Sequence, residues 1–404
     1  MKTFFRVLCR VIFWVLIIIT LFQGASPIYD FPETKVFSGA QLYNPYQNID
    51  SLGFAEDFKK TNIHAHESRK GMPFEYMHDY AEGEFAAIYK DAGYQYALVS
   101  DHQYINPISP VEAYEHGINL NNFHVNSYET QDVWWFDFPL MFRKESQMQW
   151  QINKLRERGA TMISINHPYR WRWGLGEDKV TNLRGYDVVE VARGGEASWD
   201  YALSAGHYVM LSATDDSHFP DSINATMQIR YSMTAAKNAS ELVGAIKEGR
   251  SYGVELMRGK SPRGAGTEPK FHSVRLFGDT LRIKSPERVD SIVFVGQGGE
   301  VMQRGTGAEY IFKESDTYIR ATLYLSNGMV VWLNPVARIS ALQGVEPAVV
   351  NWWWTILNWI CVVIIAFLLY IIMRKTTRRK RRVTSNHYKR AAYRASRKGR
   401  YVNY

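Results

Sequence analysis

The sequence predicts an α/β domain followed by a smaller all-β module, with an apolar segment at each end of the chain. Strand and helix patterns alternate up to about residue 257, which is typical of an α/β barrel or a doubly wound sheet. A Gly-, Lys- and Pro-rich stretch at 258–269 predicts a linker. Short alternating segments then predict a β-sandwich over 270–345.

The N-terminal segment, 1–24, has an apolar run at 11–22 that follows Lys2, Arg6 and Arg10. This pattern is typical of a cleaved signal peptide or of an uncleaved signal anchor. The absence of a clear A-x-A cleavage site favours the anchor. Both interpretations place the domain at 25–257 outside the cytoplasm.

The C-terminal segment, 352–373, is an apolar run interrupted only by Thr355 and Asn358, which predicts a transmembrane helix. Three tryptophans at 352–354 suit one membrane interface, and the basic residues of 374–404 suit a cytoplasmic tail. We therefore expect a protein of the bacterial cell membrane with its main domain extracytoplasmic.

The formal net charge of +8 belongs to the two ends of the chain. Residues 374–404 carry 13 Lys and Arg, and the first 23 residues carry three more. Neither segment contains Asp or Glu, so residues 24–373 hold 32 basic residues and all 40 acidic ones. The acidic main domain is not expected to bind nucleic acid. The tail is expected to contact anionic membrane lipids. Cys9 and Cys361 are the chain's two cysteines, so the main domain uses neither a disulfide nor a thiol nucleophile.

The elements of the main domain follow from hydrophobic periodicity and from capping residues. Helices are predicted at 75–92, 145–158, 196–204 and 240–247. Gly159 is expected to end the second helix, and Asn238 or Ser240 to cap the last one. Strands are predicted at 94–100, 122–130, 160–165, 187–191 and 207–213, and within the all-β module at 273–277, 280–284, 291–295, 309–312, 318–325 and 330–333.

Four short histidine-containing islands follow apolar runs of the α/β region. They are His64-Ala65-His66, Asp101-His102, Asn166-His167 and Asp215-Asp216-Ser217-His218. The carboxyl ends of parallel strands meet at one face of a sheet or barrel, so these side chains should converge. Imidazole and carboxylate ligands suit zinc, manganese or iron. The sequence therefore predicts a divalent metal site with one to two ions.

Five ordered motifs resemble the PHP (polymerase and histidinol phosphatase) superfamily of metal-dependent phosphoesterases. They are HAHES, VSDH, the glutamate of NSYETQ, NHP and the run from YDVVEV to DDSH. The resemblance extends over about half of the chain and is greatest to the carbaryl-hydrolase-like branch. It implies a distorted (β/α)7 barrel and a hydrolase, most simply a phosphoesterase that uses metal-bound hydroxide. The branch suggests hydrolysis of carboxylic or carbamic esters as an alternative.

The resemblance also implies a role for each site residue. His64, His66, Glu129 and Asp216 would hold a first ion, with Glu129 bridging to a second ion that His167 also binds. His102 and His218 would lie beside a third ion or the substrate, and Asp101, His102 or His218 would assist proton transfer. Arg170 and Arg193 follow the strands of His167 and Glu190, and they would clamp a small anionic substrate. Surface salt bridges are the competing interpretation for these two arginines.

One departure from the family pattern affects the second ion. The family places another histidine after its glutamate, and that position falls near Trp134, which cannot ligate a metal. The sequence therefore leaves open a non-catalytic envelope protein that binds a metal or ligand. His116 and His124 have no spacing that fits the cluster, and they are interpreted as structural histidines.

Overall fold

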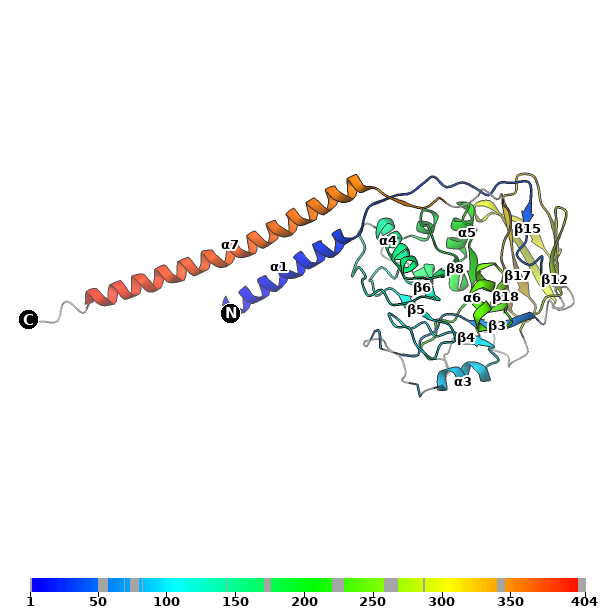
Figure 1. Cartoon of the computed structure of the whole chain (residues 1–404), viewed down its shortest axis with the longest axis horizontal. Helices are drawn as coiled ribbons and strands as arrows, with labels where there is room; N and C mark the ends of the chain where they lie inside the picture. Colours follow the sequence, from blue (N-terminus) through cyan, green and yellow to red (C-terminus); the bar gives the residue numbers. More distant parts are fainter. Residues whose placement is uncertain are drawn as a thin grey trace, which may run out of the picture. The chain divides into compact units, whose positions relative to one another are not determined.

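A computed structural model describes residues 2–49, 57–68, 70–72, 80–81, 83–142, 144–170, 176–219, 229–257, 268–285, 288–339 and 346–398. The chain divides into two compact units (Figure 1). One contains Met1–Tyr29 with Val350–Tyr404, and the other contains Asp30–Val349. Residues 258–267 of the linker predicted at 258–269, and the last six residues of the tail, lie outside the described residues.

The smaller unit is a pair of helices, α1 (Lys2–Ala25) and α7 (Trp352–Lys398). Both are long and apolar enough to span a membrane, with mean hydropathies of 2.2 over Val7–Ala25 and 2.8 over Trp352–Lys375. They lie side by side and run in opposite directions (Figure 1). The rings of Trp14, midway along α1, and Tyr370 are 6.5 Å apart. At the C-terminal end of α1, Asn358 Nδ2 donates to Gly24 O at 3.4 Å.

The larger unit contains a five-stranded sheet in the order β5-β6-β7-β8-β9. Its strands are β5 (Ala113–His116), β6 (Val125–Tyr128), β7 (Met162–Ile165), β8 (Val188–Glu190) and β9 (Met210–Ser212). Strand β6 is antiparallel to both of its neighbours, whereas β7, β8 and β9 are parallel. Consequently the start of β6 lies at the same edge as the ends of β5 and β7.

A second, ten-stranded sheet joins the two predicted domains. Its main path is β15-β14-β17-β18-β11-β10-β3-β4, and β19 and β2 extend it from β17. Their bounds are β2 (Leu42–Tyr43), β3 (Phe58–Asn62), β4 (Tyr96–Ala97), β10 (Arg230–Ala235), β11 (Ser251–Leu256), β14 (Val289–Val295), β15 (Val301–Gly305), β17 (Tyr318–Leu325), β18 (Met329–Leu333) and β19 (Val336–Arg338).

This topology corrects the predicted domain division. β18 pairs with β11 along Tyr252–Leu256, so the strands of 270–345 continue the sheet of the α/β region instead of forming a separate sandwich. The two large sheets meet at isolated bridges, Ala65 with Ser217 and His102 with Glu115. Among the described residues, no sheet closes on itself as a barrel.

The chain has further elements outside these two sheets. The helices are α3 (Glu84–Asp91), α4 (Lys144–Glu157), α5 (Glu196–Ser204) and α6 (Ala239–Lys247), and short 3-10 turns lie at Pro168–Arg170, Glu177–Thr181, Ala192–Gly194 and Gln297–Gly299. A three-stranded sheet contains β12 (Ser273–Phe277), β13 (Thr280–Lys284) and β16 (Glu309–Ile311), and β1 (Tyr29–Asp30) pairs with β20 (Val349–Val350). The predicted helices at 145–158, 196–204 and 240–247 are confirmed within one residue. The predicted cap is also confirmed, because Asn238 Oδ1 accepts from Glu241 N at 3.1 Å.

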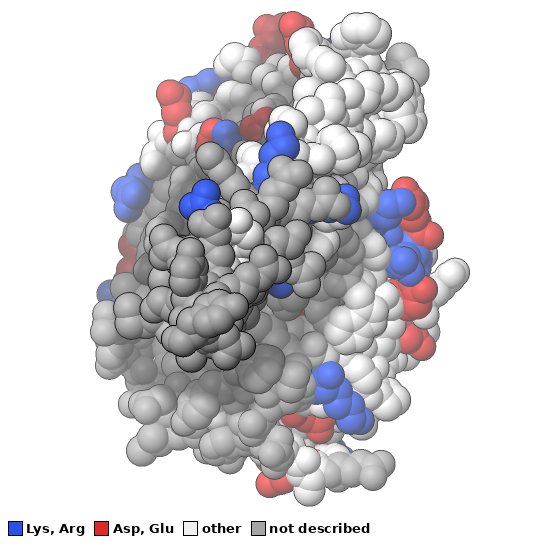
Figure 2. Space-filling view, turned by 90° about the vertical axis from the view of Figure 1, so that its left-hand side faces the viewer, with Lys and Arg blue, Asp and Glu red and all other residues white. Residues whose placement is uncertain are grey.

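Charged side chains of both signs lie on the one face of the molecule that Figure 2 draws. On the face drawn in Figure 2, Lys and Arg lie among Asp and Glu and form no single-sign area. Over its described residues, this face shows no continuous basic stripe.

A buried histidine makes the stability of the larger unit depend on pH. Burial, together with the positive charge of Arg184, lowers the pKa of His207 to about 4. The unfolded chain binds this proton below about pH 6.5, so the stabilising contribution is complete above that pH and is lost as the pH falls towards 4. We expect the free energy of unfolding to fall by about 3 kcal/mol over this interval. His207→Gln should reduce this slope in chemical denaturation measured at several pH values, and an unchanged slope would contradict the assignment.

Candidate metal centre

The carboxylate of Glu115, in β5, lies at the centre of a buried cluster of imidazoles. Its Oε2 atom is 3.3 Å from His64 Nε2 and 3.2 Å from His66 Nε2. Asp216 Oδ1 is 3.4 Å from each of these two nitrogens. These four ligand atoms all lie within 4.8 Å of one another.

The other oxygen of Glu115 faces a second pair of imidazoles. Its Oε1 atom is 3.3 Å from His124 Nδ1 and 3.3 Å from His167 Nε2. On the Oε2 side, His102 Nε2 lies at 3.1 Å. Each oxygen of the Glu115 carboxylate therefore faces its own set of imidazoles, as the oxygens of a carboxylate that bridges two ions would.

The sheet geometry explains why these residues meet. Glu115 lies near the end of β5, His124 just precedes β6 and His167 follows β7, and all three positions are at one edge because β6 is antiparallel. The chain after β3 approaches the chain after β9 through two hydrogen bonds. His66 N donates to Ser217 O at 2.9 Å, and Asp216 N donates to His64 O at 3.1 Å. These bonds bring the histidines of the first island to the edge of the five-stranded sheet.

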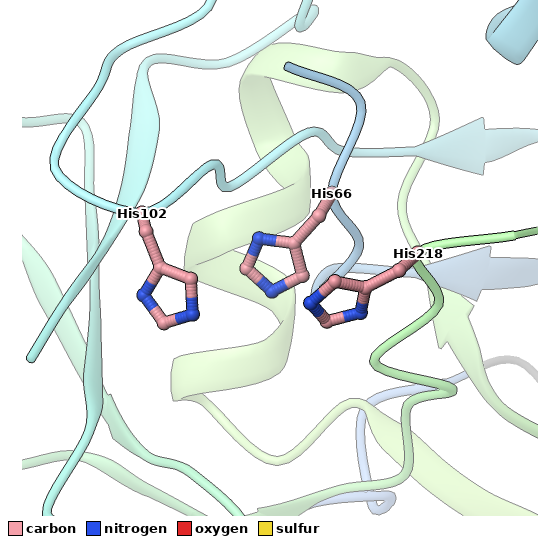
Figure 3. Close-up of side chains that lie close together, drawn as sticks. All are labelled: His66, His102 and His218. Atoms are coloured by element: carbon pink, nitrogen blue, oxygen red, sulfur yellow. The ribbon is translucent and has the colours of Figure 1, made fainter. Parts of the chain in front are cut away.

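A third group of imidazoles lies beside the first. His66, His102 and His218 come from three separate segments, and their rings gather in one place (Figure 3). The ring centroids of His66 and His218 are 4.4 Å apart, and those of His66 and His102 are 4.7 Å apart. The predicted convergence of His64, His66, His102, His167, Asp216 and His218 is observed.

The donor set fits a divalent cation. Tetrahedral coordination with bonds of roughly 2.1 Å places ligand atoms about 3.4 Å apart. The distances from Glu115 and Asp216 to the His64 and His66 nitrogens, 3.2 to 3.4 Å, match this spacing. His64 Nε2 and His66 Nε2 also face each other at 3.3 Å, and a shared cation accounts for two ring nitrogens directed at one point.

Electrostatics keeps the two carboxylates ionised. Burial opposes ionisation of Glu115, but the positive charge of His102, His64 and His124 outweighs it and holds the Glu115 pKa well below its usual range. Burial is likewise outweighed at Asp216, where His64 and a hydrogen bond from His66 hold the pKa well below its usual range. Deprotonated carboxylates are the form that ligates metals.

Further carboxylates hold the ligands in place. Glu190 Oε1 is 3.4 Å from His64 Nδ1, and Glu190 Oε2 accepts from His167 N at 2.6 Å. Asp215 accepts from Asn62 Nδ2 at 2.7 Å and from the Tyr89 hydroxyl at 2.8 Å. Such partners fix ring orientation in metal sites.

Asp101, which the resemblance assigned to proton transfer, has a different setting. It is fully buried, and its Oδ1 atom accepts from Glu67 N at 2.7 Å and from Ser68 N at 2.9 Å. Its Oδ2 atom accepts from Asn106 Nδ2 at 2.9 Å. Asp101 therefore fixes the loop that follows His66, which is a positioning role.

Backbone strain accompanies the cluster. Non-glycine residues with positive φ include His167 at 29°, Asp216 at 49° and Arg193 at 62°. Such conformations are unfavourable for L-residues and persist where the surrounding contacts enforce them. Here the enforced conformations coincide with two residues of the cluster and with an arginine at its rim.

Glu129 does not belong to this cluster, which corrects the ligand set implied by the family resemblance. It follows β6 and therefore lies at the opposite edge of the sheet, where its Oε2 accepts from the Thr161 hydroxyl. Glu115 is the glutamate that lies among the imidazoles instead. The rule that ligands follow parallel strands does not locate Glu115, within β5, or His124, before the antiparallel strand β6.

Trp134 also lies away from the ligand position. Its indole stacks on His116 at 5.1 Å with an interplanar angle of 18°, within an aromatic cluster that includes Phe136. The imidazole of His124 lies beside the glutamate of the cluster, with its Nδ1 atom 3.3 Å from Glu115 Oε1. Two features of the sequence indicate these ligand candidates. Glu115 directly follows the apolar residues Ala113 and Tyr114, and His124 directly precedes the segment at 125–128.

The two predicted substrate arginines lie at the rim of the cluster. Arg170 Nη1 is 2.8 Å from Asp216 Oδ2. Arg193 Nη1 donates to the Tyr169 hydroxyl at 2.9 Å, and its Nη2 donates to Asp215 O at 3.3 Å. A small recess beside the cluster is lined by His167, Tyr169, Glu190, Ala192, Arg193, Thr214 and Asp216.

Comparison with known proteins yields one structural similarity. No protein-family model and no curated protein matches the chain. A crystal structure of a two-domain protein from Bacteroides vulgatus, described as containing a predicted PHP-like metal-dependent phosphoesterase, is similar with 12% sequence identity and a TM-score of 0.34. The similarity covers 74% of this chain and 96% of that one.

Proposed function

We propose that this protein is a membrane-anchored, metal-dependent hydrolase that acts on phosphoesters. The observation that carries the proposal is the Glu115 carboxylate, whose two oxygens face separate sets of imidazoles. His64, His66, Glu115 and Asp216 would hold one ion, and Glu115, His124 and His167 a second. Zinc, manganese and iron suit this donor set.

The chemistry follows from the position of these groups. Divalent ions bound here would polarise a phosphoryl oxygen and make water acidic enough to react near neutral pH. His102 and His218 flank His66 at the third group, so they are placed to contact substrate or to move a proton. Asp101 and Glu190 position ligands and do not take part in the reaction itself.

The rim favours an anionic substrate. Arg170 and Arg193 lie within reach of the recess beside Asp216, and guanidinium groups bind phosphate oxygens through paired hydrogen bonds. A neutral carboxylic or carbamic ester has no negative charge for these two guanidinium groups to bind. The proposal therefore prefers a phosphoester to the ester substrates of the carbaryl-hydrolase-like branch.

The helix pair supports the proposed topology. Because α1 and α7 run antiparallel, the basic residues before α1's apolar run and those after Met373 fall at the same end of the pair. The positive-inside rule would place that end in the cytoplasm and the larger unit outside. We propose that α1 is retained as an anchor, that the cell is bacterial and that the tail binds anionic lipids.

Metal analysis and a phosphatase assay on the full chain in detergent test the function. We expect bound zinc, manganese or iron, and turnover of p-nitrophenyl phosphate that depends on that metal. His64→Ala and Asp216→Ala should abolish turnover, because each removes a ligand of the first ion. His272→Ala, at an exposed histidine outside the cluster, is the matched control and should retain full activity. A protein that binds no metal and hydrolyses nothing would overturn the proposal.

A further inference from the structure

Four large apolar side chains are exposed on two adjoining loops of the larger unit, and we call them the apolar rim. They are Ile118, Leu120, Trp135 and Phe142, with Leu120 exposed by 69%, Phe142 by 63% and Trp135 by 61%. Large apolar side chains exposed on adjoining loops can mark an interaction site in a folded protein. The proposed hydrolase function gives no role to these residues.

Hydrogen bonds between the two loops hold the apolar rim together. Leu120 N donates to Pro139 O at 3.0 Å, and Met141 N donates to Asn121 Oδ1 at 2.6 Å. The buried carboxylate of Asp137 accepts from Ile118 N at 2.6 Å and from Asn119 Nδ2 at 3.1 Å. These hydrogen bonds fix the positions of the two loops that carry the apolar rim.

The apolar rim lies beside the metal centre along the chain and in the sheet. The loop that carries Ile118 and Leu120 connects Glu115 in β5 to His124 before β6. Both ends of this loop are at the sheet edge where the cluster lies. A molecule whose apolar part contacts the rim would hold its polar part near the cluster.

The chain's two apolar helices indicate which partner the apolar rim contacts. The larger unit begins at Asp30 and ends at Val349, whereas the apolar helices end at Ala25 and begin at Trp352. About four extended residues reach only roughly 15 Å. If these helices span a bilayer, the larger unit stays next to its surface. Exposed tryptophan, phenylalanine, leucine and isoleucine are typical of groups that enter the headgroup–acyl boundary.

We infer that the apolar rim rests in the surface of the bilayer that carries the helices, and that the metal centre thereby acts on phosphomonoesters of membrane lipids. This inference rests on the proposed function. In the reaction, water adds to phosphorus, the P–O bond to the lipid alcohol breaks, and the alcohol leaves with a proton. The products are inorganic phosphate and a lipid hydroxyl.

Spin labelling tests the docking independently of activity. Full chains with Cys9→Ser and Cys361→Ser would carry either Leu120→Cys or Ile311→Cys, each labelled with a nitroxide and placed in phosphatidylcholine–phosphatidylglycerol nanodiscs. Ile311, in β16, is the matched control because it is also exposed by 69%. We expect the label at 120 to be relaxed more by oxygen than by a water-soluble nickel chelate, and the label at 311 to show the reverse. Equal behaviour at the two positions, or protection of 120 from both reagents by a second protein copy, would overturn the inference.

A kinetic comparison tests the substrate class. A variant with Ile118→Ser, Leu120→Ser and Phe142→Ser should hydrolyse dioleoyl phosphatidic acid in phosphatidylcholine vesicles roughly tenfold more slowly or worse, since even about 1.4 kcal/mol of lost docking energy has that effect. Its turnover of soluble p-nitrophenyl phosphate should be unchanged. Equal loss on both substrates, or no loss on vesicles, contradicts lipid presentation by the rim. If the unaltered protein hydrolyses neither substrate, the proposed function itself is wrong.

Discussion

Replacing Glu115 by glutamine should remove tightly bound metal from both groups of ligands and lower phosphatase turnover by roughly a thousandfold or more. The carboxylate faces His64 and His66 through one oxygen, and His124 and His167 through the other. An amide keeps the size of the side chain but cannot supply two anionic ligand atoms. Loss of metal activation is worth several kcal/mol of transition-state stabilisation.

The matched control is Glu129→Gln, the same chemical change at the ligand first expected from the motifs. Glu129 accepts from Thr161 at the far edge of the sheet, so this variant should retain its metal and its turnover. Elemental analysis and steady-state kinetics on both proteins decide the question, with circular dichroism to verify that each is folded. Metal loss in the Glu129 variant together with normal binding in the Glu115 variant would show that the cluster has been assigned to the wrong glutamate.

The sequence predicted the histidine cluster because each island follows a strand whose direction was inferred correctly. His167 and Asp216 follow parallel strands of the five-stranded sheet, and His64 and His66 follow β3 of the other sheet, which meets it at the Ala65–Ser217 bridge, so the general rule that ligands follow strands located them. The same rule failed at β6, which is antiparallel. Strand direction there is set by pairing with β5 and β7, and a single segment at 122–130 contains no information about its partners.

The domain division failed for a related reason. Short strands at 273–333 were recognised by their alternation, but alternation does not reveal which strand lies next to which. β11 and β10 were not predicted, although they join the two halves of the large sheet. Buried residues of β11, such as Val254, share one apolar core with Leu281 and Phe294 from the later strands. A continuous core of this kind makes the later strands part of the same unit.

Arg320 joins the later strands to the helix that follows the metal-site strand β8. It lies in β17 and is nearly fully buried, with 3% exposure. Its Nε and Nη2 atoms contact the two carboxylate oxygens of Asp200, in α5, at 2.6 and 2.7 Å. Nη1 contacts Glu196 Oε1 at 3.1 Å, and the guanidinium lies over the Trp199 ring at 5.3 Å.

Arg320→Met should lower the free energy of unfolding by about 3 kcal/mol, because it leaves Asp200 without its buried partner. For a unit of this size that corresponds to a fall in Tm of roughly 4 to 5 °C. Arg282→Met is the control, since the Arg282–Glu309 pair has a similar 2.7 Å contact but side chains exposed by 53% and 52%. Exposed pairs contribute about 1 kcal/mol or less, so thermal unfolding followed by fluorescence should separate the two variants clearly.

A second substitution identifies the cause of that loss. If the uncompensated charge of Asp200 is responsible, adding Asp200→Asn to Arg320→Met should recover part of the lost Tm, because the buried anion disappears. If packing of the guanidinium over Trp199 is responsible, the double variant should be no more stable than the single one. An Arg320 variant as stable as the Arg282 variant would contradict the role of this contact. The strands after residue 270 would then be held to the α/β region by β11–β18 pairing and the shared core alone.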